Sequence, residues 1–184
     1  MIKRLFYLLL TTYYLFLLGC GQKLGIRKDA YQENQRALFI FNRAEAFRKN
    51  GDYESAIVEF RNYLDEYGDI YYGDEALFKI ANCFEELGQI EQAILSYSTI
   101  LKRYKHSAII PEVLFRIGDC YKRQGEWKES IKTYLEIIKR YYWTEWGEKG
   151  KEETDRLLEE HKKSKWADKM KKRIEKLVER MEKK

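Results

Sequence analysis

The sequence predicts an all-α fold in which three helix pairs stack into an α-solenoid that ends in C-terminal capping helices. One observation is composition: the 184 residues include a single proline, 45% hydrophobic residues and 35% charged residues, a balance that favours helices over disorder. The other is repetition, because GDYESAIVEF from Gly51 is followed by GQIEQAILSY from Gly88 and GEWKESIKTY from Gly125. A module that cannot bury its apolar face alone repeats in this way.

Residues 1–19 have the features of an export signal. Lys3 and Arg4 precede a largely apolar run, residues 5–18, which is short for a bilayer span of about 20 residues but suits a signal peptide. The run ends in LLGC, which resembles the bacterial lipobox. The resemblance implies that the Cys20 thiol is lipidated, carries fatty acids such as palmitate and becomes the new N-terminus. An uncleaved anchor helix is the alternative, and in both cases the body leaves the cytoplasm.

The resemblance to bacterial lipoproteins also bears on location, because Gly21 rather than aspartate follows the cysteine. In a host with two membranes, this implies the periplasmic face of the outer membrane. In a host with one membrane, it implies the outer face of the cytoplasmic membrane. Residues 20–35 lack apolar periodicity, so they are expected to form the lipidated N-terminus and a tether.

Residues 36–146 hold the three predicted units, at about 37–73, 74–110 and 111–146. Each unit is expected to be two helices joined by one of the three glycines, which end the first helix in a left-handed conformation. Nine positions agree in all three copies at a spacing of 37 residues. Among them are two rows of small residues and one of aromatic residues: Ala44, Ala81 and Gly118; Ala56, Ala93 and Ser130; Phe60, Tyr97 and Tyr134.

These units resemble the tetratricopeptide repeat. In the second unit, the apolar, small, aromatic and glycine positions of that pattern are Leu77, Ala81, Phe84, Gly88, Ile90, Ala93 and Tyr97. The resemblance implies a right-handed solenoid whose first helices line a concave surface. It also carries over the positions of a partner-binding groove: Phe41, Phe78 and Phe115; Glu45, Asn82 and Asp119; Arg48, Glu85 and Lys122. The phenylalanines are equally well explained as core residues.

Residues 147–184 are two charged helices in which the repeat register is expected to stop after Trp146. They carry 14 basic and 10 acidic side chains, which suits a polar cap on a solenoid or a docking helix. Residues 161–174 echo the start of the third unit, with Ser164 matching Ser107. We therefore expect a cap or a diverged fourth repeat, in which this stretch is the first helix after an insertion.

No motif indicates an enzyme, a cofactor or a metal site. His106 and His161 lack paired ligands, and Cys83 and Cys120 occupy one slot of successive units. Such slots are about 10 Å apart, too far for a disulfide, so both cysteines are expected to be free and buried. The net charge of +5 falls to +3 without Lys3 and Arg4, and this balance does not indicate nucleic acid as a partner.

The lipobox, tether and repeats together resemble the BamD family of outer-membrane assembly lipoproteins. The resemblance implies a membrane-anchored, non-catalytic scaffold for envelope proteins or their peptide segments, in membrane protein assembly or envelope organisation. The fuller members of that family carry five repeats, whereas this chain has three and a remnant. The alternatives are a repeat lipoprotein associated with the Tol-Pal system or with pilus assembly, and an accessory subunit of a cell-wall or transport enzyme.

Overall fold

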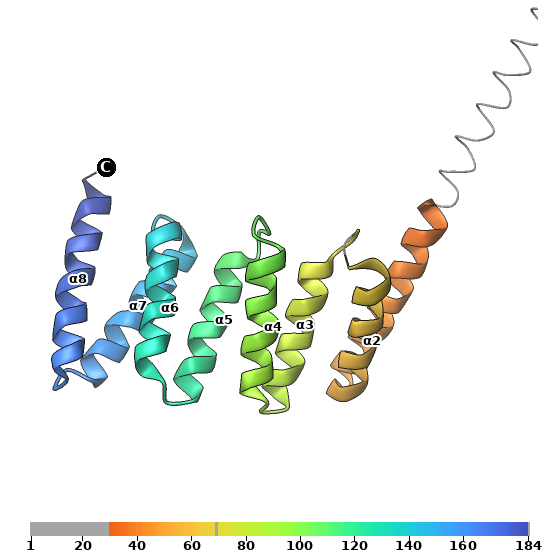
Figure 1. The fold of residues 1–184 in the computed structure, drawn as a ribbon, viewed down its shortest axis with the longest axis horizontal. Helices are drawn as coiled ribbons and strands as arrows, with labels where there is room; N and C mark the ends of the chain where they lie inside the picture. The colour runs from red at the N-terminus through yellow and green to blue at the C-terminus, as the bar shows by residue number, and fades with distance from the viewer. Residues whose placement is uncertain (1–29, 69, 184) are drawn as a thin grey trace, which may run out of the picture.

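The structure, a computed structural model, describes residues 30–68 and 70–183. Its helices stand side by side in a single row (Figure 1), and each packs against the next along the chain. After an N-terminal helix that runs through residue 49, the helices are α2 (Tyr53–Tyr67), α3 (Gly73–Glu86), α4 (Ile90–Arg103), α5 (Ile110–Arg123), α6 (Trp127–Tyr141), α7 (Glu145–Glu160) and α8 (Lys165–Glu182). No strand occurs in the described ranges. The predicted solenoid of helix pairs is confirmed.

The export signal and Cys20 lie outside the described residues, and so does most of the predicted tether. Residues 30–35 are an exception, because they are helical and continue into the N-terminal helix. The N-terminal helix therefore begins within the stretch predicted as a tether. Gln32, Glu33 and Arg36 are good helix formers but polar and exposed, so an apolar periodicity does not reveal them. No helix within the described part of the chain is both long and apolar enough to cross a membrane.

The three glycines end the first helices as predicted. Gly51, Gly88 and Gly125 have φ angles of 79°, 71° and 77°, in the left-handed region that glycine adopts without steric cost. The chain then turns sharply, and the backbone N–H that follows each glycine returns to a carbonyl five residues earlier, at 2.8–3.0 Å. These hydrogen bonds satisfy carbonyls that the helix end would otherwise leave unpaired.

Small residues and aromatic rings hold each helix pair together. Ala56, Ala93 and Ser130 are fully buried, which lets the paired helices approach closely. In the third pair, a Cβ added at Gly118 would lie 2.4 Å from Cε1 of Tyr134. The Ser130 hydroxyl donates a hydrogen bond of 2.8 Å to the Gly118 carbonyl across the same contact. The predicted role of these positions in packing is confirmed.

The 37-residue register continues into α7 and α8, so the expectation that it stops after Trp146 is wrong. On α7 the buried residues lie 37 positions after buried residues of α5: Gly147, Gly150, Thr154 and Leu157 match Ile110, Val113, Ile117 and Cys120. On α8, the buried Ala167 and Ile174 match Ser130 and Ile137. In this register α8 corresponds to a second helix, not to the first helix of a fourth unit.

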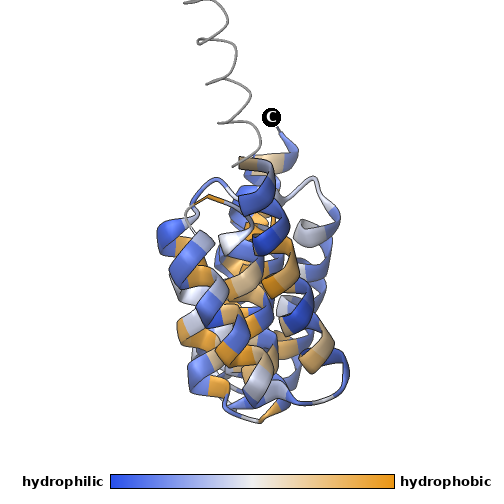
Figure 2. Ribbon diagram, turned by 90° about the vertical axis from the view of Figure 1, so that its right-hand side faces the viewer, coloured by the Kyte–Doolittle hydropathy of each residue, from blue (hydrophilic) through white to orange (hydrophobic). Residues whose placement is uncertain are grey.

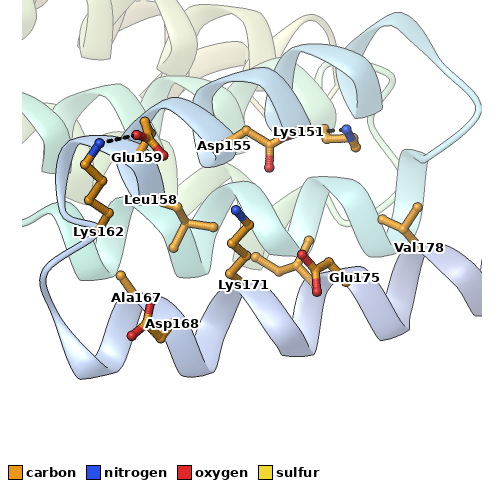
Figure 3. A pocket seen from close by; sticks show the side chains of 11 residues that line it. Lys151, Asp155, Leu158, Glu159, Lys162, Ala167, Asp168, Lys171, Glu175 and Val178 are labelled. Carbon is orange, nitrogen blue, oxygen red and sulfur yellow. Dashed lines mark hydrogen bonds and ion pairs between the residues drawn. The ribbon is translucent and has the colours of Figure 1, made fainter.

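Residues that hold α5 to α6 are nevertheless replaced by charged ones in α7 and α8. Asp155 takes the place of Gly118, and Lys171 that of Tyr134. A hollow of about 460 Å³ separates the two helices, lined by these side chains together with Lys151 and Glu175 (Figure 3). The fourth pair therefore packs on the third pair, but its own two helices, α7 and α8, pack only loosely against each other.

The solenoid ends in a polar surface at α8. Leu64, Leu101 and Ile138, each buried or half-buried in its second helix, correspond to the exposed Glu175. Leu135, which is buried in α6, corresponds to the exposed Lys172. A further helix could not bury an apolar face here without desolvating these charges.

Candidate functional site

The three phenylalanines of the predicted groove pack against aromatic residues of the second helices. Ring centroids lie 5.3 Å apart for Phe41 and Phe60, 5.5 Å for Phe78 and Tyr97, and 5.3 Å for Phe115 and Tyr134. Phe78 is only 8% exposed. The phenylalanine rings therefore pack between the first and second helices. The groups accessible on the face of the first helices are polar side chains.

Two of the predicted groove residues, Asn82 and Asp119, are held by core tyrosines. The Tyr134 hydroxyl donates to Asp119 Oδ1 at 2.7 Å. The Tyr97 hydroxyl contacts Asn82 Oδ1 and lies 2.6 Å from Glu85 Oε1. Burial, and then hydrogen bonding to Glu85 or Asp119, raises the pKa of both tyrosines well above its ordinary value. Both hydroxyls therefore remain protonated donors that fix the groove side chains.

The first unit differs because Phe60, which has no hydroxyl, occupies the tyrosine slot. Glu45 turns instead to Arg48, with two hydrogen bonds of 2.9 Å, and lies 4.0 Å from Lys79 Nζ of the second unit. The hydrogen bonds from Arg48 lower the pKa of Glu45. Glu45 is thus fully engaged as a carboxylate.

Ion pairs also link the second, third and fourth units. Lys122 Nζ lies 3.0 Å from Asp119 and 2.8 Å from Glu153 of α7. Arg123 lies 3.1 Å from Glu85, whose side chain is 11% exposed. The predicted groove residues are therefore brought onto one face, where most of their charges are already paired within the chain.

A hollow of about 310 Å³ opens on this face at the junction of the second and third units. Its charged and amide lining residues are Arg48, Asn82, Glu85, Glu86, Arg116 and Arg123. Arg48, Asn82 and Glu85 belong to the predicted groove, whereas Glu86, Arg116 and Arg123 do not. The repeat register could have found Arg116, which lies 37 residues after Lys79.

Arg116 differs from its counterpart Lys79 because the glutamate position of the preceding unit is neutral. Lys79 lies near Glu45 of the preceding unit, whereas the residue that corresponds to Glu45 for Arg116 is the neutral Asn82. Within the described ranges, Arg116 forms no ion pair. The hollow therefore contains a guanidinium with free donors, beside an amide and two carboxylates.

The described residues contain no group of histidine, cysteine and carboxylate side chains that could hold a metal ion. Cys83 and Cys120 are both buried as free thiols. Burial raises the pKa of Cys83 to about 11 and that of Cys120 to about 12, which disfavours the nucleophilic thiolate. The chemistry of this face is that of hydrogen bonding and charge pairing.

Comparison with known proteins identifies the family of these units. The tetratricopeptide repeat family matches residues 39–69, 75–107 and 112–141, together just over half of the chain. No curated protein matches the chain.

Several solved structures share the fold. The tetratricopeptide repeat domain of Arabidopsis FLU superposes with a TM-score of 0.53 at 23% identity, over 61% of this chain and 99% of that chain. PcrH, a Pseudomonas aeruginosa protein, was solved in complex with the chaperone binding region of PopB. It gives a TM-score of 0.52 at 15% identity, over 67% of this chain and 94% of that chain. SycD of Yersinia enterocolitica, with a peptide of the translocator YopD, gives 0.52 at 21% identity, over 68% and 92%.

Proposed function

Because this chain belongs to the tetratricopeptide repeat family, we propose that it is a non-catalytic scaffold that binds a segment of a partner protein on the face of its first helices. Two structures that share the fold, PcrH and SycD, were solved with a region or peptide of another protein. The same use of the fold is proposed for this chain.

The observation that carries this proposal is the hollow around Arg116. Its guanidinium forms no ion pair with any described residue, and Asn82 and Glu85 beside it are fixed by Tyr97. A bound segment that places a carboxylate against Arg116 would complete the pattern that Glu45 and Lys79 form one unit earlier. We therefore propose a segment with an acidic side chain at this position.

The proposed scaffold is anchored by lipid at Cys20 on the periplasmic face of an outer membrane, and serves outer-membrane protein assembly or envelope organisation. The support is the sequence of residues 1–20 and the resemblance to BamD-like lipoproteins. Several buried acyl chains, at about 0.8 kcal/mol per methylene, would hold the protein firmly. Radiolabelled palmitate should enter the wild type and be absent from Cys20→Ala, which should remain unprocessed. Label retained by the variant would refute lipidation at this site.

Binding is tested by co-purification from detergent-solubilised membranes. Barrel-assembly subunits, Tol-Pal components or an enzyme should be recovered with the wild type, and their identity separates the three assignments. Arg116→Gln should weaken recovery at least tenfold, equivalent to about 1.4 kcal/mol. The matched control is Arg140→Gln on α6, whose side chain is 57% exposed. Thermal unfolding should be the same for both variants. Undiminished recovery with Arg116→Gln would contradict the proposed site.

A further inference from the structure

The first unit exposes three positions that the other units bury, which are Phe39, Arg43 and Ala46 of the N-terminal helix. Together with the neighbouring Phe47 and with Val58 of α2, they form a surface that we call the N-terminal end face. Phe39 is 65% exposed and Val58 is 55% exposed. Figure 2 looks onto this end of the row, where hydrophobic segments are visible on the helices. A hollow of about 270 Å³ beside it is lined by Phe47 and Val58 and, on α2, by Glu54, Ser55 and Glu59.

The repeat register shows what this surface does elsewhere. The residues 37, 74 and 111 positions after Phe39, Arg43 and Ala46 are all buried: Ala76, Val113 and Gly150; Ile80, Ile117 and Thr154; Cys83, Cys120 and Leu157. The second helix of the preceding unit covers them, since α2 packs on α3, α4 on α5 and α6 on α7. At Gly150, for example, an added Cβ would lie 3.4 Å from Ile137 Cβ of α6.

The N-terminal end face has kept apolar residues, whereas the opposite end of the row has lost them. At α8 the outward positions are the charged Lys172 and Glu175, as expected of a surface that meets only water. Phe39 and Phe47 instead remain apolar. Arg43 stands in an isoleucine position but pairs with Glu59 of α2, so its charge is compensated within the chain.

We propose that the N-terminal end face binds an amphipathic α-helix of a partner protein, laid across it as α2 lies across α3. Three covered copies of this surface in the same chain are each covered by a helix, which argues for a helix as the occupant. Arg36 is exposed one turn before Phe39 and forms no ion pair with any described residue. The partner helix therefore carries an acidic residue beside its apolar stripe. A small residue opposite Phe39 makes room for the ring.

A second copy of this chain fits this face poorly. Head-to-tail stacking would bury Lys172 and Glu175 of one copy against Phe39 of the next, which desolvates charge. Face-to-face pairing would bring together the Arg36 side chains of both copies, which pair with no described acidic residue, and like charges repel. This interaction goes beyond the groove proposed above, because the chain would then hold two partners at once.

The test places a photo-crosslinking residue at position 39 of the full chain, Phe39→p-benzoylphenylalanine, in cells of the organism that makes it. The expected product is one adduct to another protein, whose cross-linked peptide belongs to a helix with an apolar stripe and an acidic residue. The matched control at Lys172, on the polar end, should give no such adduct. Cross-linking to lipid, to residues 1–29 of the same chain or to a second copy would overturn the proposal, and so would no adduct.

A second variant separates this interaction from folding and from the groove. Phe39→Asp, read out with the cross-linker at Ala46, should reduce the adduct at least tenfold and leave the unfolding temperature unchanged, since Phe39 is largely exposed. Val113→Asp, at the covered counterpart, should unfold the protein. Arg116→Gln should leave the adduct intact, so failure of the groove proposal and failure of this one are distinguishable. An undiminished adduct with Phe39→Asp would refute the end face as the site.

Discussion

The third helix pair, α5 with α6, and the fourth, α7 with α8, share one residue register but close to different extents. Both first helices bury the positions that face the preceding unit: Val113 and Ile117 in α5, Gly150 and Thr154 in α7. Only the third pair keeps the contact between its own helices, where Tyr134 packs on Gly118. The fourth pair has Lys171 and Asp155 at these places and a hollow between them (Figure 3).

This difference teaches that stacking between units and pairing within a unit rest on separate residues. Stacking needs small or aliphatic side chains on one side of the first helix, and α7 retains these. Pairing needs a small residue on the first helix and a ring on the second, and α7 and α8 have lost both. A solenoid can therefore end with a unit that docks onto its neighbour while its last helix stays solvated on the inner side.

The largest expected effect is the loss of the ring that closes the third pair. Tyr134→Ala should lower the free energy of unfolding by about 3–5 kcal/mol, because it leaves a cavity under a fully buried ring. Lys171→Ala, at the same register position of the fourth pair, should change it by no more than about 0.5 kcal/mol. Urea unfolding of the two variants measures the difference. Equal losses would mean that α7 and α8 are paired as tightly as α5 and α6.

The fold could be predicted from sequence where the repeat pattern is complete. Gly88 with Ala81, Ala93 and Tyr97 specifies a helix, a tight turn and a close helix contact, and neighbouring copies confirm each choice. A diverged fourth unit was predicted, but its register was misplaced for a physical reason. The positions that best identify a repeat are the pairing positions, and two of them are charged there, Asp155 and Lys171. The stacking positions are kept, but residue types such as Gly150 and Thr154 also occur in many other contexts and do not by themselves indicate a repeat.

The candidate site was predictable only in part. Asn82, Asp119 and Lys122 lie on one face as the register predicted. The sequence could not decide how far Phe78 is exposed, because this depends on the distance to Tyr97 in the second helix. The register could have identified Arg116 and the neutral Asn82 opposite it, but that no other described carboxylate pairs with this arginine follows from the fold.

A smaller effect is expected from adding a methyl group inside the pairing contact. Gly118→Ala should cost about 1–2 kcal/mol, because the new Cβ would press on the ring of Tyr134 while alanine recovers about 1 kcal/mol of helix propensity. The second unit tolerates Ala81, but Ser130 holds the third pair close through its bond to the Gly118 carbonyl. Asp155→Ala should be neutral or slightly stabilising. Thermal unfolding should show a lower unfolding temperature for Gly118→Ala and no decrease for Asp155→Ala.

High pH should weaken the third pair through Tyr134, and the fourth pair has no tyrosine at that position. An unfolded tyrosine ionises near pH 10, whereas burial and the bond to Asp119 raise the pKa of folded Tyr134. Above pH 10 the unfolded chain has released a proton that the folded chain retains. Stability therefore falls as pH rises, by about 1.4 kcal/mol per pH unit for each such tyrosine. Tyr134→Phe should make the decline less steep in urea unfolding between pH 9.5 and 11, and an unchanged slope would mean that its hydroxyl is solvated when folded.

The smallest expected effect is a gain in stability, and it distinguishes the contribution of a tyrosine ring from that of its hydroxyl. Tyr63 of the first unit occupies the slot of Ile100, Ile137 and Ile174, and its buried hydroxyl has no hydrogen-bond partner among the described residues.

A buried hydroxyl without a partner loses its hydrogen bonds to water and gains none in the folded protein, whereas the Tyr134 hydroxyl donates to Asp119. Tyr63→Phe keeps the ring, whose centroid lies 5.2 Å from that of Phe41, and should leave stability unchanged or raise it by up to about 1 kcal/mol. Tyr134→Phe also keeps its ring but should cost about 1–2 kcal/mol, because Asp119 loses a donor. If both variants lose stability equally in urea unfolding at pH 7, the Tyr63 hydroxyl has a partner in solution, and the contrast between hydroxyls with and without an acceptor fails.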